Sequence, residues 1–333
     1  MAEPQFLVVR HGSLGDIVHA FPAVGGLRES FPNAEIIWLT HPKWEALVRA
    51  STSADEVWTV DTRDWTSLRG ILARIRTHHF DRAIDYQGLW KSALIPFLAR
   101  VPRRIGFSSL TVREAGVPLL YTDRVCVNVA SHVADQNGEL SLRAGAKRGT
   151  APVALHIPPE EEAVVKGALL NEGVVEYVVL SPGGGWRSKC WPVERFGKLA
   201  LRIREELQLR CVINAGPGEE DLVATLVKAA GRAQPMPYRG NLAQLMALLK
   251  NAAAVVAGDT GPLHLADALG APVVAIFGPT DPTRNGPYRH NGVVLRWEGA
   301  ETTYKRGAEA DESLRHISVD EVFDALRGLR EAA

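Results

Sequence analysis

Cysteine, net charge and long apolar runs are all scarce in this chain. Only three cysteines occur among 333 residues, and Cys126, Cys190 and Cys211 lack metal-ligand spacing. An odd number without a pairing pattern indicates a reducing compartment rather than a disulfide scaffold. Lys and Arg number 38 and Asp and Glu also number 38. The net charge therefore gives no case for nucleic acid as a partner.

Targeting and membrane signals are also missing from the sequence. No apolar run reaches 18 residues, and residues 1–9 show no basic start followed by an apolar core. We therefore expect a cytoplasmic protein. At 333 residues the chain is too long for one ordinary hydrophobic core, so we expect two domains.

The stretch 252–277 predicts a strand, a tight turn, a helix and a second strand. Thr260 and Gly261 lie where the first strand gives way to the helix, so their backbone N–H groups are expected to be free. Such a helix start suits an anion, most plausibly a phosphate. The alternative is an ordinary Asp/Thr helix cap that binds no ligand, and the spacing alone leaves both open.

The first 31 residues predict the opening of a Rossmann-like domain. A strand at 6–9 leads into a loop with Gly12 and Gly15, and a helix follows at 22–31. The loop lacks the Gly-x-Gly-x-x-Gly spacing, so a dinucleotide site is poorly supported. Asp16 lies near the carboxyl end of the first strand, where a carboxylate is well placed for acid or base chemistry. Alternatively, Asp16 is a helix N-cap.

Further apolar segments at 34–40, 56–60 and 82–85 predict a parallel sheet. Between residues 63 and 113 ten Lys or Arg stand against three Asp, a basic island in a neutral protein. Such an island suits an anionic partner, whether an acidic sugar, a phosphate or a membrane surface. Its apolar run at 94–99 is either an interfacial segment or the buried face of a helix.

The second half repeats the pattern of strands that end in ligand-type loops. After a Gly- and Pro-rich boundary at 145–159, a strand at 177–181 enters a glycine-rich loop that carries Lys189, a point charge for phosphate. This loop is not a P-loop, because the Gly-Lys-Ser/Thr order is absent. A strand at 210–215 leads to Glu219 and Glu220, which suit ribose hydroxyls or merely complement a helix dipole.

Three motifs taken in order resemble the family 9 glycosyltransferases, the lipopolysaccharide heptosyltransferases. They are Gly12-Ser13-Leu14-Gly15-Asp16 and the stretches 259–264 and 277–282. Within that family, residues 85–93 and Arg113-Glu114 are most similar to the heptosyltransferase I members. The resemblance covers nearly the whole chain.

The resemblance implies an α/β protein of GT-B architecture, with two Rossmann-like domains whose parallel sheets face each other across a cleft. We expect an N-terminal acceptor-binding domain at 1–155, a linker and helix at 156–175, and a C-terminal nucleotide-sugar donor domain at 176–315. The last helix, at 316–333, is expected to pack back on the N-terminal domain.

The activity implied is inverting, metal-independent transfer of heptose from ADP-L-glycero-D-manno-heptose to a Kdo residue of Kdo-lipid A, at the cytoplasmic face of the inner membrane. No cofactor is expected beyond this donor substrate. The alternatives are another family 9 transferase that adds a later heptose or a different sugar, and a GT-B nucleotide-sugar 2-epimerase. The oligomeric state stays open.

The resemblance also assigns site residues. Asp16 matches the catalytic base. The donor-binding positions are Lys189, Glu219, Asp259, Thr260, Gly261 and His264, and the acceptor-binding positions are Arg63, Lys91 and Arg113. His264 is alternatively a packed helix histidine. Cys190 departs from the family pattern, and no role is assigned to it.

Overall fold

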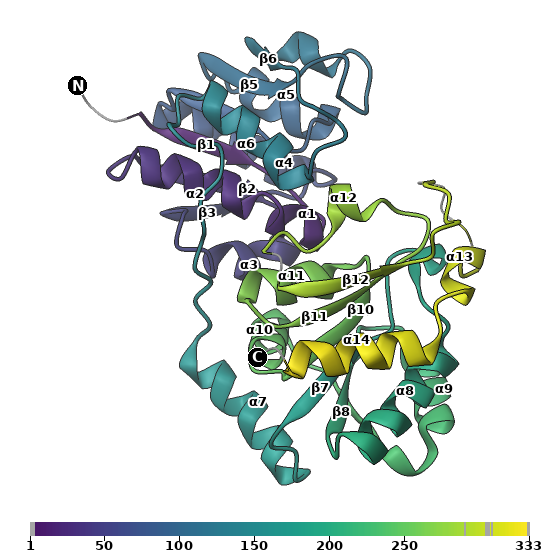
Figure 1. Cartoon of the computed structure of the whole chain (residues 1–333). Helices are drawn as coiled ribbons and strands as arrows, with labels where there is room; N and C mark the ends of the chain where they lie inside the picture. The colour runs from purple at the N-terminus through teal and green to yellow at the C-terminus, as the bar shows by residue number, and fades with distance from the viewer. Residues whose placement is uncertain (1–3, 290, 304–306, 308, 332–333) are drawn as a thin grey trace. The chain divides into compact units, whose positions relative to one another are not determined.

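The computed structural model describes residues 4–289, 291–303, 307 and 309–331. The chain forms two compact units, 1–156 and 157–333, which are coloured from purple to yellow along the chain in Figure 1. Each unit contains one six-stranded sheet, and all neighbouring strands within each sheet are parallel. The predicted α/β class with two Rossmann-like sheets is confirmed.

The N-terminal unit is built around two strands that are buried on both faces, as parallel strands usually are. Its strands are β1 (Phe6–Val9), β2 (Ile36–Thr40), β3 (Glu56–Thr59), β4 (Arg82–Asp85), β5 (Arg103–Phe107) and β6 (Asp123–Val125). Its α-helices are α1 (Leu14–Val18), α2 (Phe21–Ser30), α3 (Glu45–Arg49), α4 (Trp65–His78), α5 (Trp90–Leu98) and α6 (Val133–Arg143).

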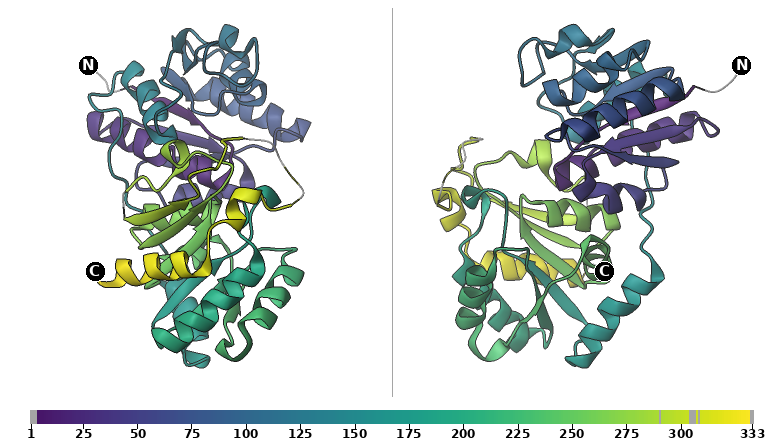
Figure 2. Two further views of the ribbon diagram at one scale, coloured as in Figure 1. Left: turned by 45° about the vertical axis from the view of Figure 1, so that its right-hand side comes forward. Right: turned by 180° about the vertical axis from the view of Figure 1, so that it is seen from behind.

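Helices cover both faces of this sheet (Figure 2). On one face Leu7 and Val9 form a core with Ile71 of α4 and Ile95 of α5. On the other face Phe21 of α2 packs edge-on against a strand tryptophan, and α2 itself packs against α6. In the strand order β3-β2-β1-β4-β5-β6 the chain builds the sheet outward in one direction up to β3 and in the other direction from β4. We call this topological switch point, between the parallel strands β1 and β4, the reversal. Open α/β sheets bind ligands at the carboxyl ends of the strands at this reversal.

The C-terminal unit repeats the same plan with the strand order β12-β11-β10-β7-β8-β9, so its reversal lies between β7 and β10. Its strands are β7 (Tyr177–Ser181), β8 (Arg210–Asn214), β9 (Met236–Tyr238), β10 (Ala254–Gly258), β11 (Val273–Phe277) and β12 (Gly292–Arg296). Its α-helices are α7 (Pro159–Asn171), α8 (Val193–Glu206), α9 (Glu220–Ala230), α10 (Leu242–Lys250), α11 (Gly261–Leu269), α12 (Pro282–Asn285), α13 (Glu312–Arg315) and α14 (Val319–Glu331).

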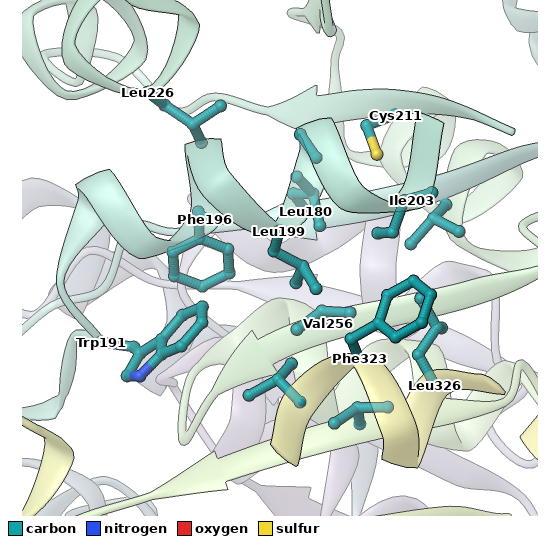
Figure 3. Close-up of a cluster of buried hydrophobic side chains, with 14 of the residues drawn as sticks. Leu180, Trp191, Phe196, Leu199, Ile203, Cys211, Leu226, Val256, Phe323 and Leu326 are labelled. Atoms are coloured by element: carbon teal, nitrogen blue, oxygen red, sulfur yellow. The ribbon is translucent and has the colours of Figure 1, made fainter. Parts of the chain in front are cut away.

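The last helix corrects one expectation. We expected 316–333 to pack back on the N-terminal domain, but Val322, Phe323 and Leu326 of α14 are buried in the core of the C-terminal unit. Figure 3 shows Phe323 and Leu326 beside Val256 of β10 and the side chains of α8. The physical reason is the amphipathic pattern of α14, whose apolar face covers the β10-β11-β12 side of the sheet. The boundaries and functions predicted for the domains stay predictions.

The described helices include none that is both long enough and apolar enough to cross a membrane. The run at 94–99 lies within α5, where Ile95 and Pro96 are buried while Phe97 and Leu98 are exposed. One side of this helix therefore belongs to the core and the other faces solvent.

Candidate functional site

The predicted donor residues lie at the carboxyl edge of the second sheet, around the reversal between β7 and β10. Lys189 ends a short 3₁₀ helix, η3 (Arg187–Lys189), in the loop after β7, and Asp259 directly follows β10. The loop passes so close to β10 that a Cβ at Gly258 would lie 2.7 Å from the carbonyl oxygen of Lys189. Glycine at 258 therefore permits the backbone approach that brings the two charged residues together.

Asp259 is the centre of a buried charge cluster. Its Oδ2 lies 2.5 Å from Nζ of Lys189, and its Oδ1 lies 3.1 Å from Nε2 of His264. The exposed fractions of these side chains are 4% for Asp259, 17% for Lys189 and 6% for His264. Burial by itself would raise the pKa of Asp259, but the hydrogen bond from His264 and the charge of Lys189 outweigh it and hold the pKa well below its usual range.

The start of α11 offers polar groups that have no hydrogen-bond partner among the described residues. Thr260 is the N-cap residue, yet its side chain makes no capping hydrogen bond. Thr260 is 8% exposed, and its Oγ1 has no hydrogen-bond partner among the described residues. Gly261 begins the helix, so its N–H has no acceptor within the helix. Thr260 is thus the N-cap residue, as the alternative of an Asp/Thr helix cap held, but without a side-chain capping hydrogen bond, and Asp259 binds Lys189 and His264. The binding of an anion at this helix start stays a prediction.

The glycine-rich loop after β7 brings Glu219 to the same edge. A Cβ at Gly183 would lie 1.9 Å from Oε1 of Glu219, and a Cβ at Gly184 would lie 2.8 Å from Cγ2 of Thr260. The carboxylate of Glu219 accepts a 2.7 Å hydrogen bond from the N–H of Gly216. Consecutive glycines thus contact Glu219 on one side and Thr260 on the other. The six predicted donor residues are brought together, and their roles stay predictions.

Cys190 also belongs to this loop. Its thiol lies 3.4 Å from the carbonyl oxygen of Trp186, whose ring lies under the ammonium group of Lys189 at 4.5 Å. Burial is the main cause that raises the pKa of the Cys190 thiol, and Glu219 adds to the shift. The thiol is therefore protonated at neutral pH, and the structure gives no reason for cysteine at this position.

Asp16 lies in α1, directly after the loop that leaves β1. The N-cap of this helix is Ser13, so the predicted alternative of Asp16 as the N-cap is wrong. Oδ2 of Asp16 accepts hydrogen bonds from the backbone N–H of Ser13 at 2.9 Å and from its hydroxyl at 2.8 Å. Oδ1 lies 2.6 Å from Nη2 of Arg10. The carboxylate is held at both oxygens while 44% of the side chain stays exposed.

Arg10 joins the two strands of the N-terminal reversal. It is 8% exposed, and its guanidinium donates to the backbone carbonyl of Tyr86 in the loop after β4. In return the side chain of Gln87 accepts a 2.7 Å hydrogen bond from the backbone N–H of His11. The loop after β4 is held by buried Asp85, which accepts hydrogen bonds from two backbone N–H groups and two hydroxyls. This network fixes the backbone that carries Asp16.

His11 is a buried and uncharged residue of this network. Neither ring nitrogen has a hydrogen-bond partner among the described residues. Burial is the largest cause that lowers the pKa of His11, to about 3, and the charge of Lys91 adds to it. Sequence analysis did not single out Arg10 or His11. Their position directly after a buried strand was the available signal, but their partners lie about 76 residues away.

The three predicted acceptor residues follow the carboxyl ends of different strands of the first sheet. Arg63 follows β3, Lys91 lies in the first turn of α5 after β4, and Arg113 lies in the loop after β5. All three are exposed. The described residues supply no carboxylate partner for Lys91 or Arg113. Their charges therefore remain available for an anionic ligand, and their assignment to the acceptor stays a prediction.

No group of three or more His, Cys, Asp or Glu side chains is placed to hold a metal ion within the part of the chain that the structure describes. The cations found near the two reversals are side chains: Lys189 beside Asp259 at the second sheet and Arg10 beside Asp16 at the first.

Comparison with known proteins places this geometry in a family. Residues 69–313 match the model of glycosyltransferase family 9 (heptosyltransferase). Lipopolysaccharide heptosyltransferase 1 of Pseudomonas aeruginosa is 28% identical over 308 residues, which cover 87% of this chain and 82% of the relative. Lipopolysaccharide heptosyltransferase 2 of Salmonella typhimurium is 27% identical over 275 residues, which cover 77% of each chain.

A solved structure confirms the architecture. The Escherichia coli ADP-heptose lipopolysaccharide heptosyltransferase II is similar with a TM-score of 0.83 and 21% identity, over 99% of this chain and 100% of that one. The fold is therefore GT-B. Since the family model spans well over half of the sequence, this chain belongs to glycosyltransferase family 9 and is a heptosyltransferase.

Proposed function

We propose that this enzyme transfers heptose from ADP-L-glycero-D-manno-heptose to a Kdo residue of Kdo-lipid A, with inversion and without a metal ion. The observation that carries the proposal is the position of Asp16. In a family 9 chain, it is a partly exposed carboxylate held by Arg10 and Ser13 at the reversal of the N-terminal sheet. A carboxylate fixed in this way can accept a proton without first reorganising.

In the proposed reaction, Asp16 takes the proton from a Kdo hydroxyl as that oxygen attacks the anomeric carbon of the heptose. A new C–O bond forms on one face of the sugar while the bond to the ADP phosphate breaks on the opposite face, and ADP leaves with the bonding electrons. Direct displacement therefore needs one base and stabilisation of the leaving group. The anomeric configuration is inverted.

The cluster after β10 supplies that stabilisation. Lys189 is held by Asp259, so its charge is fixed where negative charge grows on the departing diphosphate. The unused hydroxyl of Thr260 and the N–H of Gly261 bind phosphate oxygens at the helix start. Glu219 holds the ribose hydroxyls, and His264 with Asp259 completes the donor site.

Exposed cations on the first unit bind the acceptor in this proposal. Lys91 and Arg113 lack a carboxylate partner among the described residues, and Arg63 is also exposed. Kdo carries a carboxylate and lipid A carries phosphates, so these cations complement the acceptor. The reaction then takes place at the cytoplasmic face of the inner membrane, where such an acceptor is anchored.

A second candidate is the transfer of a later heptose of the core. The similarity to a heptosyltransferase 2 at 27% identity supports it almost as strongly as the similarity to a heptosyltransferase 1 at 28% supports the first step. The fold and the roles of the residues would be the same in both. A nucleotide-sugar 2-epimerase needs no acceptor, so it would leave Asp16 and the exposed cations without a role.

The donor is tested by ADP or UDP release from purified protein in the presence of Kdo-lipid A. We expect release with ADP-heptose at a rate far above that with ADP-glucose or UDP-glucose. Binding of ADP-heptose without release in the presence of any heptose acceptor would contradict transferase activity. Equal rates with ADP-glucose and ADP-heptose would contradict the proposed sugar.

A further inference from the structure

Large apolar side chains are exposed along one short part of the N-terminal unit. Leu110 and Leu119 are 81% and 72% exposed, and Trp90, Phe97 and Leu98 are each about 40% exposed. All five fall within thirty residues, between the start of α5 and the 3₁₀ helix η2 (Val117–Leu120). Isolated apolar side chains on a surface are ordinary, but such a concentration indicates a binding surface.

Contacts link these segments into one surface. α5 and η2 pack together over a small core of Ala93, Val117, Leu120 and Tyr121. The guanidinium of Arg104 lies 5.5 Å from the centre of the Phe97 ring and donates to the carbonyl of Leu120 in η2. Exposed residues of α5 and η2 therefore lie on neighbouring segments rather than on separate faces.

The start of α5 is tied to the loop before η2 in the same way. The N–H of Trp90 donates to the carboxylate of Glu114 at 2.7 Å, and a Cβ at Gly116 would lie 3.0 Å from the Trp90 ring. Arg124 of β6 donates to the carbonyl of Pro118. Since β6 is the edge strand of the sheet, the surface lies at the β6 edge of the unit, near α5 and β5 in Figure 1.

This surface is cationic in a chain that is neutral overall. Residues 89–125 contain six Lys or Arg against two Asp or Glu. Of the six, only Arg103 forms an ion pair among the described residues, with Asp123. The α5–η2 surface is defined by its apolar residues and by cations that form no ion pair among the described residues: Trp90, Phe97, Leu98, Leu110, Leu119, Arg100, Arg104 and Arg124. Lys91 and Arg113, which the proposed function assigns to the acceptor, lie on the same segments and are not counted in it.

We propose that the α5–η2 surface binds the headgroup region of an anionic phospholipid membrane. Apolar side chains interspersed with cations at an exposed edge, where Glu114 and Asp123 are the two acidic residues of the segment 89–125, match the composition of interfacial membrane-binding segments. The aliphatic stems of arginine lie along apolar surface while the guanidinium reaches phosphate, so cation and apolar contacts act together. A protein partner with a neutral surface would leave the positive surplus unmatched.

The surface acts before any sugar transfer. Binding to lipid places the N-terminal unit at the plane where a lipid-anchored acceptor presents its sugars, and this raises the local concentration of acceptor. The inference does not depend on the sugar that is transferred, because it concerns bulk phospholipid rather than the acceptor itself.

The test is co-sedimentation of the full chain with vesicles that contain no lipopolysaccharide. Vesicles of phosphatidylcholine alone are compared with vesicles that also contain phosphatidylglycerol. We expect binding to the anionic vesicles, weaker binding as salt is added, and little binding to phosphatidylcholine alone. Failure to bind the anionic vesicles at low salt would overturn the proposal, whatever the outcome of the transferase assay.

Two variants locate the surface. Leu110→Ser combined with Leu119→Ser is expected to lower vesicle affinity by about tenfold or more, and Arg100→Asn should lower it and weaken its salt dependence. Asparagine is chosen because residue 100 has a positive φ of 63°, which asparagine tolerates. The matched controls lie on the other unit: Val175→Ser at an 81% exposed position and Lys228→Gln on α9. Vesicle affinity that falls equally in the controls would overturn the assignment.

A last measurement separates the membrane from the acceptor. The paired leucine variant should retain the kcat/KM of the native chain for a water-soluble acceptor that carries Kdo without acyl chains. If kcat/KM on this acceptor falls as much as vesicle binding, the α5–η2 surface belongs to the acceptor site and the membrane proposal is wrong. The midpoint of thermal unfolding is measured for each variant, so that a folding defect is recognised.

Discussion

Nη2 of Arg10 lies 2.6 Å from Oδ1 of Asp16, and the same guanidinium is anchored on the backbone carbonyl of Tyr86. The arginine is almost fully buried, whereas the aspartate is partly exposed. A buried cation thus connects the carboxyl end of β4 to the one side chain near β1 that we propose as the base. Arg10 acts as a positioning residue, because its buried guanidinium binds Oδ1 of Asp16 while 44% of the Asp16 side chain remains exposed.

Replacing Arg10 tests this positioning role. Arg10→Met should lower kcat by roughly 100-fold, because even a small displacement of the Asp16 carboxylate takes it out of hydrogen-bonding position for the acceptor hydroxyl. The KM for the donor should not change. Arg10→Lys keeps a charge at this position and should recover part of the loss. The measurement is steady-state kinetics with donor and acceptor varied separately. A lysine variant no better than the methionine variant, or a large rise in donor KM, would argue for a general folding role.

The glycine-rich loop offers a steric test of the donor site. A Cβ at Gly183 would meet the carboxylate of Glu219 at 1.9 Å, whereas a Cβ at Gly185 would meet nothing within 4 Å. Gly183→Ala should therefore displace Glu219 and raise the donor KM about as much as Glu219→Gln does. Because both changes remove the same contact, the double variant should show less than the sum of the two effects. Gly185→Ala is the matched control and should leave KM unchanged. Full additivity would mean that Gly183 acts through some other contact.

Asp259 contributes to stability as well as to the donor site. Its pKa is depressed in the folded state, so its contribution is complete above the unfolded value of 3.8 and is lost as the pH falls through the folded pKa. Asp259→Asn leaves the ammonium group of Lys189 without its partner, and we expect a loss on the order of 3 kcal/mol in the free energy of unfolding at pH 7. Below pH 4 the difference in the free energy of unfolding between the native chain and Asp259→Asn should become smaller. Urea denaturation at several pH values measures both effects, and a gap that widens in acid would contradict the account.

His11 predicts a different pH dependence of stability. Its folded pKa of about 3 lies below the unfolded value of 6.5, so the unfolded chain binds a proton between these limits that the folded chain rejects. Stability therefore rises with pH in this window. Between pH 7 and pH 5 the native chain should lose about 2 kcal/mol through His11 alone.

The variant His11→Leu removes this source of pH dependence, so its free energy of unfolding should change less between pH 7 and pH 5. His156→Gln is the control, because it removes an exposed histidine instead of a buried one. If the free energy of unfolding of His11→Leu changes with pH as much as that of the native chain, groups other than His11 cause the pH dependence.

Several inner strands were predictable from the sequence because most of their residues are apolar. Segments 6–9, 34–40, 82–85 and 177–181 were predicted, and strands are found there. Strands β5, β6, β9 and β12 were not predicted. β5 begins with two arginines, β6 and β9 have three residues each, and β12 is only partly buried. A short or half-exposed strand shows no apolar run, so only its pairing partner defines it.

The candidate site divides in a similar way. Lys189, Thr260 and Asp16 lie in or directly after glycine-containing loops that follow strands, and such loops are well marked in the local sequence. The contact of Arg10 with the loop after β4, and the burial of His11, depend on segments that meet only in the folded sheet. Packing of α14 on the C-terminal core was also missed, because an amphipathic helix does not specify which sheet it covers.

Transfer onto a defined acceptor tests the central claim most directly. Purified protein is incubated with ADP-heptose and either Kdo-lipid A or the same acceptor that already carries one heptose, and the product masses are determined. We predict that one heptose is added to the heptose-free acceptor and that Asp16→Asn lowers this rate by roughly 100-fold or more while it still binds ADP. A product formed only from the heptose-bearing acceptor would contradict the proposed step, and near-normal turnover by Asp16→Asn would contradict the proposed base.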